Sequence, residues 1–88
     1  MDFLAKVFVT PKAAILDPQG KAIASSLHTL GYDEVADARV GKLILLRFSA
    51  ADNARAQSRV EEMCKRLLAN EVIEEFRFEV AEQTAANR

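Results

Sequence analysis

The chain begins with an alternating pattern that is typical of a β-strand with one buried face. In FLAKVFVT, residues 3–10, the side chains of Phe3, Ala5, Val7 and Val9 fall on one side of an extended chain. The residues between them fall on the other side, because successive side chains of a strand point in opposite directions. We therefore predict a first strand over residues 3–10.

The stretch ILDPQGKAI, residues 15–23, has the residue order that favours a helix start. The Asp17 carboxylate can accept hydrogen bonds from free amides of the first turn, and the ring of Pro18 fixes a helical φ. Gly31 supplies a C-terminal stop. The predicted helix covers residues 18–30, and its apolar stripe consists of Ile23, Leu27 and Leu30.

The second half of the chain is predicted to contain two extended runs, a helix and a last strand. EVADARV (34–40) and LILLRFS (43–49) are two extended runs around Gly41, which predicts a β-hairpin. A second amphipathic helix is expected over residues 52–69, with Asn70 as its stop. A last alternating strand follows over residues 72–80.

The resulting order, β-α-β-β-α-β, predicts an α+β two-layer sandwich of the ferredoxin-like type or a close variant. One four-stranded antiparallel sheet would carry both helices on one face, with the first and third strands in the middle. Residues 1–80 would form a single domain. Residues 81–88 lack large apolar side chains and are expected to be a frayed polar tail.

The sheet face opposite the helices is predicted to be unusually apolar. If Val7, Val9 and their neighbours point toward the helices, four large side chains point away from them. Such a face is typical of an interaction surface, and we predict a homodimer or higher oligomer through it. Alternatively, the C-terminal tail covers this face, or the strand phase differs by one residue. The four side chains are those of Leu4, Phe8, Leu43 and Leu45.

Composition narrows the possible partners. The 88 residues include 12 Lys or Arg and 13 Asp or Glu, so the net charge of −1 gives no electrostatic attraction to nucleic acid or anionic membranes. The expected third strand is aliphatic, without the aromatic rings that stack on RNA bases. No run of 18 apolar residues or leader-like segment is present, and there is a single cysteine. We therefore expect a cytoplasmic protein without nucleic-acid or membrane partners.

The sequence offers no catalytic constellation. Cys64 lies in the apolar stripe of the second expected helix, whereas His28 lies at the border of the first, so we expect no Cys-His pair. The three glycines are isolated and form no phosphate-binding loop. We expect no catalytic residue, cofactor or metal in this chain.

Four landmarks, in order and at the right spacing, resemble the PurS family, the small subunit of the multi-subunit formylglycinamide ribonucleotide amidotransferase, also called phosphoribosylformylglycinamidine synthase. The resemblance covers residues 5–80. The landmarks are KVFVTPKAAILDPQGKAI, LHTLGYDEV, ARVGK and MCKRLLANEVIEEFRFEV.

The resemblance implies an ATP-dependent ligase of purine (IMP) biosynthesis with glutamine as amide donor. In that family a large synthetase subunit binds ATP and magnesium, and a glutaminase subunit releases ammonia. The small subunit would bridge these two partners without chemistry of its own and help couple ammonia transfer. A second hypothesis is a free-standing dimeric ferredoxin-like module that senses a small molecule.

The positions matched to the family include nine candidate partner contacts. Several have a structural explanation as well, such as helix capping or turning. Gln19, Arg39, Lys42 and Glu74 have no such explanation and are the better candidates. Glycine in a first helical turn costs about 0.5–1 kcal/mol relative to alanine, and a closely approaching protein surface would explain Gly20. The nine candidates are Asp17, Pro18, Gln19, Gly20, Arg39, Gly41, Lys42, Asn70 and Glu74.

Overall fold

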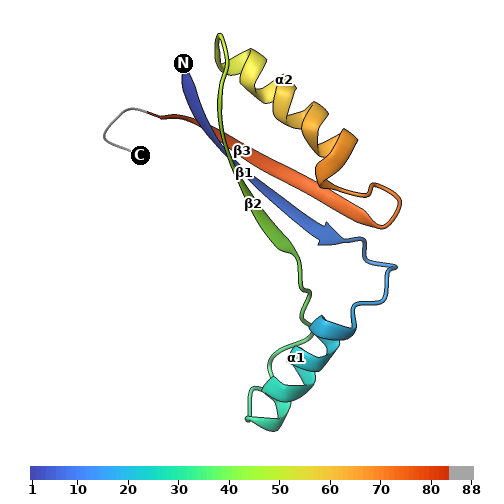
Figure 1. The fold of residues 1–88 in the computed structure, drawn as a ribbon. Helices are drawn as coiled ribbons and strands as arrows, with labels where there is room; N and C mark the ends of the chain where they lie inside the picture. The colour runs from blue at the N-terminus through green and yellow to red at the C-terminus, as the bar shows by residue number, and fades with distance from the viewer. Residues whose placement is uncertain (84–88) are drawn as a thin grey trace.

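The computed structural model describes residues 1–83; residues 84–88 lie outside the described part. It contains one antiparallel sheet of three strands in the order β2-β1-β3, with α2 across one face and α1 beyond one end (Figure 1). In chain order the elements are β1 (Asp2–Pro11), α1 (Pro18–Thr29), β2 (Lys42–Ser49), α2 (Asn53–Met63), the π-helical turn η1 (Cys64–Leu68) and β3 (Glu74–Gln83).

The core lies between the sheet and α2. On β1 the buried residues alternate as the sequence predicts, and Val7 stands between Ile44 of β2 and Phe78 of β3. The apolar stripe of α2 and η1 packs on this central strand. Side chains of the two outer strands are only partly buried, which reflects how little of the sheet a single helix covers. The fully buried residues are Phe3, Ala5, Val7, Val9, Ala56, Val60 and Cys64.

Helix α1 forms where the sequence predicts it but does not pack on the sheet. The Asp17 side chain accepts a hydrogen bond from the Gly20 amide (3.0 Å), Pro18 occupies the first turn, and Gly31 adopts φ 100° just after the helix. Figure 1 shows α1 standing beyond the strand ends. The prediction that both helices cover one face is therefore wrong, since only α2 does so.

The predicted β-hairpin is also absent. Residues 35–41 form no strand, and the chain leaves the start of β2 in the direction of α1 instead of folding back beside it (Figure 1). A two-residue hairpin turn of type I′ or II′ needs a positive φ at a central residue, and Gly31 is the only residue within 1–83 with one. The sheet therefore has three strands rather than four, and β1 alone is central.

The shape follows from this open arrangement. The Cα radius of gyration is 16.8 Å, whereas about 12 Å is expected of a compact chain of this length. At the other end of the chain, β3 continues to Gln83 and pairs there with the start of β1. Residues 81–83 of the expected polar tail thus belong to the sheet, and its remainder, 84–88, lies outside the described residues.

Candidate interaction surfaces

Two connections join the sheet to a projecting arm, which we define as residues 18–37. We call the junction where residues 12–17 and 38–41 meet the neck. Asp17 is its central group, because its Oδ1 accepts from the Gly20 amide (3.0 Å) and its Oδ2 from the Val40 amide (2.8 Å). One carboxylate therefore caps α1 and binds the returning chain.

The electrostatics of Asp17 match this role. The hydrogen bonds from Gly20 and Val40 hold the pKa of its carboxyl below the ordinary value of 3.8, and the Arg39 charge lowers it further. Partial desolvation acts in the opposite direction and is outweighed. The Asp17 carboxylate is therefore ionised at neutral pH.

Arg39 closes the neck from the other side. Its guanidinium donates to the backbone carbonyl oxygens of Lys12 (2.7 Å), Pro11 (3.2 Å) and Ile15 (3.4 Å). The planar fork of arginine can satisfy several carbonyl groups at once, which a lysine ammonium cannot do with the same geometry. Arg39 therefore has a structural role that its sequence position did not reveal.

The two glycines of this region are explained by close approach of the chain to itself. A Cβ on Gly20 would overlap the Ala38 carbonyl oxygen and lie 2.7 Å from Asp17 Oδ2. A Cβ on Gly41 would lie 2.5 Å from the Val9 carbonyl oxygen. The surface that approaches Gly20 thus includes the chain's own returning segment.

The remaining candidates lie at the same end of the sheet. The Glu74 carboxylate accepts from the Asn70 amide (2.8 Å), and Asn70 Oδ1 accepts from the Val72 amide (3.1 Å), so both organise the turn before β3. Gln19 and Lys42 are exposed, and within residues 1–83 their side chains make no hydrogen bond or ion pair. The antiparallel order gathers all nine candidates where β1 ends and β2 and β3 begin.

The sheet face opposite α2 is uncovered in the single chain. Leu43 and Leu45 are 53% and 59% exposed, and no helix lies over this side (Figure 1). Phe8 is half-buried beneath Arg77, whose guanidinium carbon lies 4.0 Å from the ring centroid. We call this surface the outer face; its apolar members are Leu4, Phe8, Leu43 and Leu45.

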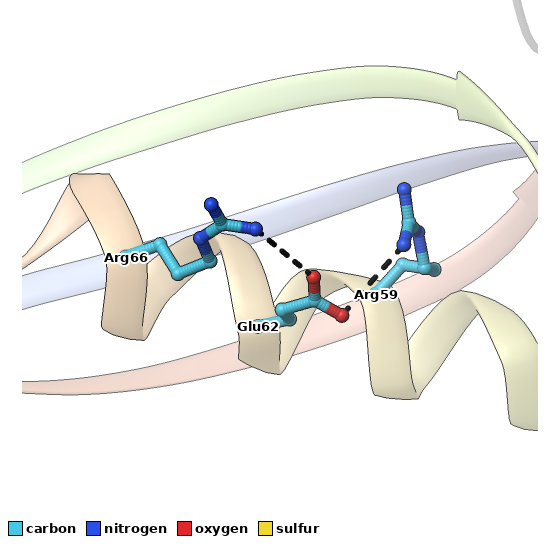
Figure 2. A network of polar contacts seen from close by, with 3 residues as sticks. All are labelled: Arg59, Glu62 and Arg66. Atoms are coloured by element: carbon cyan, nitrogen blue, oxygen red, sulfur yellow. Dashed lines mark ion pairs between the residues drawn. The ribbon is translucent and has the colours of Figure 1, made fainter.

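A third surface was missed by sequence reasoning. A groove of about 360 Å³ runs between β2 and the helix formed by α2 and η1. Arg59 and Arg66 both extend toward the Glu62 carboxylate along this helix, at 3.7 and 3.6 Å (Figure 2). The apolar lining consists of Leu46, Met63, Leu67 and Leu68. Both helices were expected on this face of the sheet, which is why no groove was predicted here.

The structure shows no grouping of residues suited to catalysis in its described part. Cys64 is buried, and desolvation, with a smaller effect of Glu61, raises the pKa of its thiol. His28 Nε2 donates to the Val35 carbonyl oxygen (2.6 Å) within the arm. Among residues 1–83 no three His, Cys, Asp or Glu side chains gather as metal ligands would. The helices of this range are also too short and polar to span a membrane.

Comparison with known proteins gives a consistent result. The family model PurS, described as phosphoribosylformylglycinamidine (FGAM) synthase, matches residues 4–82. The PurS subunit of this synthase from Bacillus subtilis is 45% identical over 83 residues, which span 94% of this chain and 98% of that protein.

Solved structures agree with the fold. PurS from Thermus thermophilus aligns with a TM-score of 0.85 at 34% identity, covering 96% of this chain and all of that one. A chain of the PurLQS structure from Thermotoga maritima aligns with a TM-score of 0.83 at 28% identity, covering 92% and 99%. With a family match over nearly its whole length, the chain belongs to the PurS family of phosphoribosylformylglycinamidine synthase subunits, which act in purine biosynthesis.

Proposed function

We propose that this chain is the non-catalytic assembly subunit of a phosphoribosylformylglycinamidine synthase and bridges its synthetase and glutaminase subunits. The complete enzyme would convert formylglycinamide ribonucleotide, ATP and glutamine into formylglycinamidine ribonucleotide, ADP, phosphate and glutamate. One observation carries the proposal: this small chain leaves three separate surfaces uncovered, namely the neck end of the sheet, the outer face and the groove beside α2. Such a chain is built to contact other proteins.

ATP and magnesium would be bound by the large synthetase subunit. The proposed contribution of this chain is to hold the glutaminase and synthetase so that ammonia passes between them without escaping to water. The assembly would act in the cytoplasm, the location expected from the sequence.

We place contacts with the partner subunits at the neck end of the sheet. Gln19 and Lys42 support this, because both are exposed and neither stabilises the neck. Replacing either with alanine should weaken binding to the partner subunits and leave the unfolding of the isolated chain unchanged. Ser58→Ala, at an exposed position of α2, is a control that should bind normally.

The outer face is proposed to associate with a second copy. Leu45→Glu introduces a charge on this face, whereas Ser58→Glu introduces the same charge at an exposed position of α2. Sedimentation equilibrium should show a lower mass for Leu45→Glu and an unchanged mass for Ser58→Glu. An unchanged mass for both variants would rule out self-association through this face.

Reconstitution is the test of the assembly role. The synthetase and glutaminase subunits are mixed with or without this chain, and glutamine-dependent ligase activity is measured beside ammonia-dependent activity. Glutamine-dependent activity should require the chain, while the synthetase retains activity with ammonium salts. Activity with glutamine that is indifferent to the chain would overturn the proposal.

A further inference from the structure

The end of the second helix contains one residue more than an α-helix would. Helix α2 continues into the π-helical turn η1, in which the Ala69 amide donates to the Cys64 carbonyl oxygen (3.0 Å), five residues back. An α-helical amide would bond four residues back, so this turn holds one extra residue. Because α-helical hydrogen bonding is the ordinary state of a helix, a contact outside η1 must keep the extra residue in place.

The extra residue changes which leucine faces the sheet. In an α-helix the side chains at i, i+4 and i+7 share one face. A helix that buries Val60 and Cys64 would therefore bury Leu67 as well. In the structure Leu67 is 83% exposed, and Leu68 packs against the core instead. The π-turn thus directs Leu67 away from the core and into the lining of the groove.

Two consecutive leucines make an α-helical end possible with the same core. In that register the Ala69 amide would bond the Lys65 carbonyl oxygen, and Leu67 would take the place of Leu68 on the sheet. The replacement leaves the buried volume unchanged, which cores tolerate well. Leu67 would no longer be the exposed side chain in the lining of the groove. The two registers therefore differ mainly in the surface that the helix end presents.

The turn after the helix keeps the extra residue in η1. The Glu74 carboxylate accepts from the Asn70 amide (2.8 Å). The amides of Ile73 (3.0 Å) and Glu74 (2.7 Å) both donate to the Asn70 carbonyl oxygen. The Ile73 carbonyl oxygen accepts from the Lys12 amide (2.9 Å), which ties the turn to the segment after β1. An α-helical end would deliver one more residue to this turn, and these hydrogen bonds would have to open.

We propose that the turn formed by Asn70 and Glu74 sets the register of the helix end and so decides whether Leu67 is presented in the groove. With the turn closed, the extra residue stays in η1 and Leu67 is exposed. With the turn open, the extra residue passes into the turn, the helix end becomes α-helical and Leu67 replaces Leu68 on the sheet. Glu74 is thus a positioning residue for the groove, where its own side chain has no place in the lining.

Scalar couplings across hydrogen bonds measure the register directly by nuclear magnetic resonance. The isotopically labelled wild-type chain should show a coupling between the Ala69 amide nitrogen and the Cys64 carbonyl carbon. In Glu74→Ala, which lacks the acceptor, this coupling should be lost and one between Ala69 and Lys65 should appear. Glu74→Gln keeps an oxygen acceptor and should retain the wild-type coupling. Glu75→Ala removes the neighbouring exposed carboxylate and is the matched control, which should also retain it.

Three outcomes would overturn the proposal. A wild-type chain without the coupling between Ala69 and Cys64 would show that the helix end holds no extra residue. An unchanged coupling in Glu74→Ala would show that the turn does not set the register. Loss of this coupling in Glu74→Ala without a new one to Lys65 would show that the helix end unfolds instead of changing register.

Single-residue deletions provide a second measurement. Deletion of Leu67 removes the extra residue, so the helix end can become α-helical while the turn keeps its length. Deletion of Glu61, which is also exposed, shortens the four-residue spacing between the buried Val60 and Cys64. The urea midpoint of unfolding should stay within about 0.5 M of wild type for the first deletion and fall by more than about 1 M for the second. Equal decreases would refute the proposal. Both tests use this chain without partner subunits, so their failure is distinguishable from failure of the ligase reconstitution.

Discussion

Gly20→Ala separates two explanations of a glycine in the first turn of α1. By helix propensity alone the change should stabilise α1, because alanine is favoured over glycine by about 0.5–1 kcal/mol. In the structure the added methyl group would overlap the Ala38 carbonyl oxygen and lie 2.9 Å from its carbon. These are backbone atoms, so the returning segment must move as a whole.

The clash should be the larger effect. Overpacking costs about 1–3 kcal/mol, and rigid backbone neighbours favour the upper half of that range. Displacing Ala38 also lengthens the hydrogen bond between the Val40 amide and Asp17, which is 2.8 Å in the structure. After subtracting the gain in propensity, we expect the arm to lose about 1–2 kcal/mol, which corresponds to about a 5- to 30-fold increase in its opening equilibrium.

Native-state hydrogen exchange measures this locally. Amides of α1 should exchange about 5- to 30-fold faster in Gly20→Ala, while those of β1 should keep their rates, because the core lies elsewhere. Ser25→Ala is the control: its position is exposed, so propensity acts alone and exchange should slow or stay unchanged. Slower exchange of α1 in Gly20→Ala would contradict this reasoning. It would show that the segment around Ala38 moves without a cost in free energy when the methyl group is added.

Four further predictions concern the core and the neck. Val60→Ala should lower the free energy of unfolding by about 2 kcal/mol in denaturant titration, since its side chain is fully buried. The Cys64 thiol, whose pKa is raised by desolvation and by Glu61, should resist alkylation until the chain unfolds, so that the labelling rate follows unfolding. Because the pKa of Asp17 is lowered, its stabilisation of the arm should be complete above its ordinary value of 3.8 and be lost as the pH falls through the lowered pKa; Asp17→Asn should remove this acid dependence of α1 exchange. Arg39→Lys should increase exchange in α1 without changing the core, because one ammonium cannot replace the bonds to three carbonyl groups.

The positions of β1 and α1 along the chain were predictable from local sequence patterns. Alternation located β1 and the side of β1 that is buried, and Asp17 with Pro18 located the start of α1. The apolar outer face followed from the same alternation, and the structure leaves Leu43 and Leu45 exposed there. These features depend on side-chain direction within one element, which the sequence determines through the two-residue and 3.6-residue periods.

The position of α1 was not predictable in this way. An apolar stripe indicates that a helix packs against something, but it does not indicate whether the helix packs on the sheet of the same chain. The ARVGKL sequence was interpreted as a hairpin because glycine permits a positive φ, whereas Gly41 serves the close approach of the Val9 carbonyl group. A glycine can serve either purpose, and the choice between them here depends on a contact with Val9, 32 residues earlier in the chain.

The roles of the candidate contact residues were even harder to predict from local sequence than the position of α1. Arg39 was selected because no local duty was visible for it, yet its three acceptors lie 24 to 28 residues earlier in the chain. Together with Asp17 it fixes the orientation of the arm before any partner binds. A pre-oriented arm loses less conformational freedom on binding than a flexible one would. The neck residues therefore contribute to assembly through geometry, and their substitution should weaken partner binding even where they touch no partner.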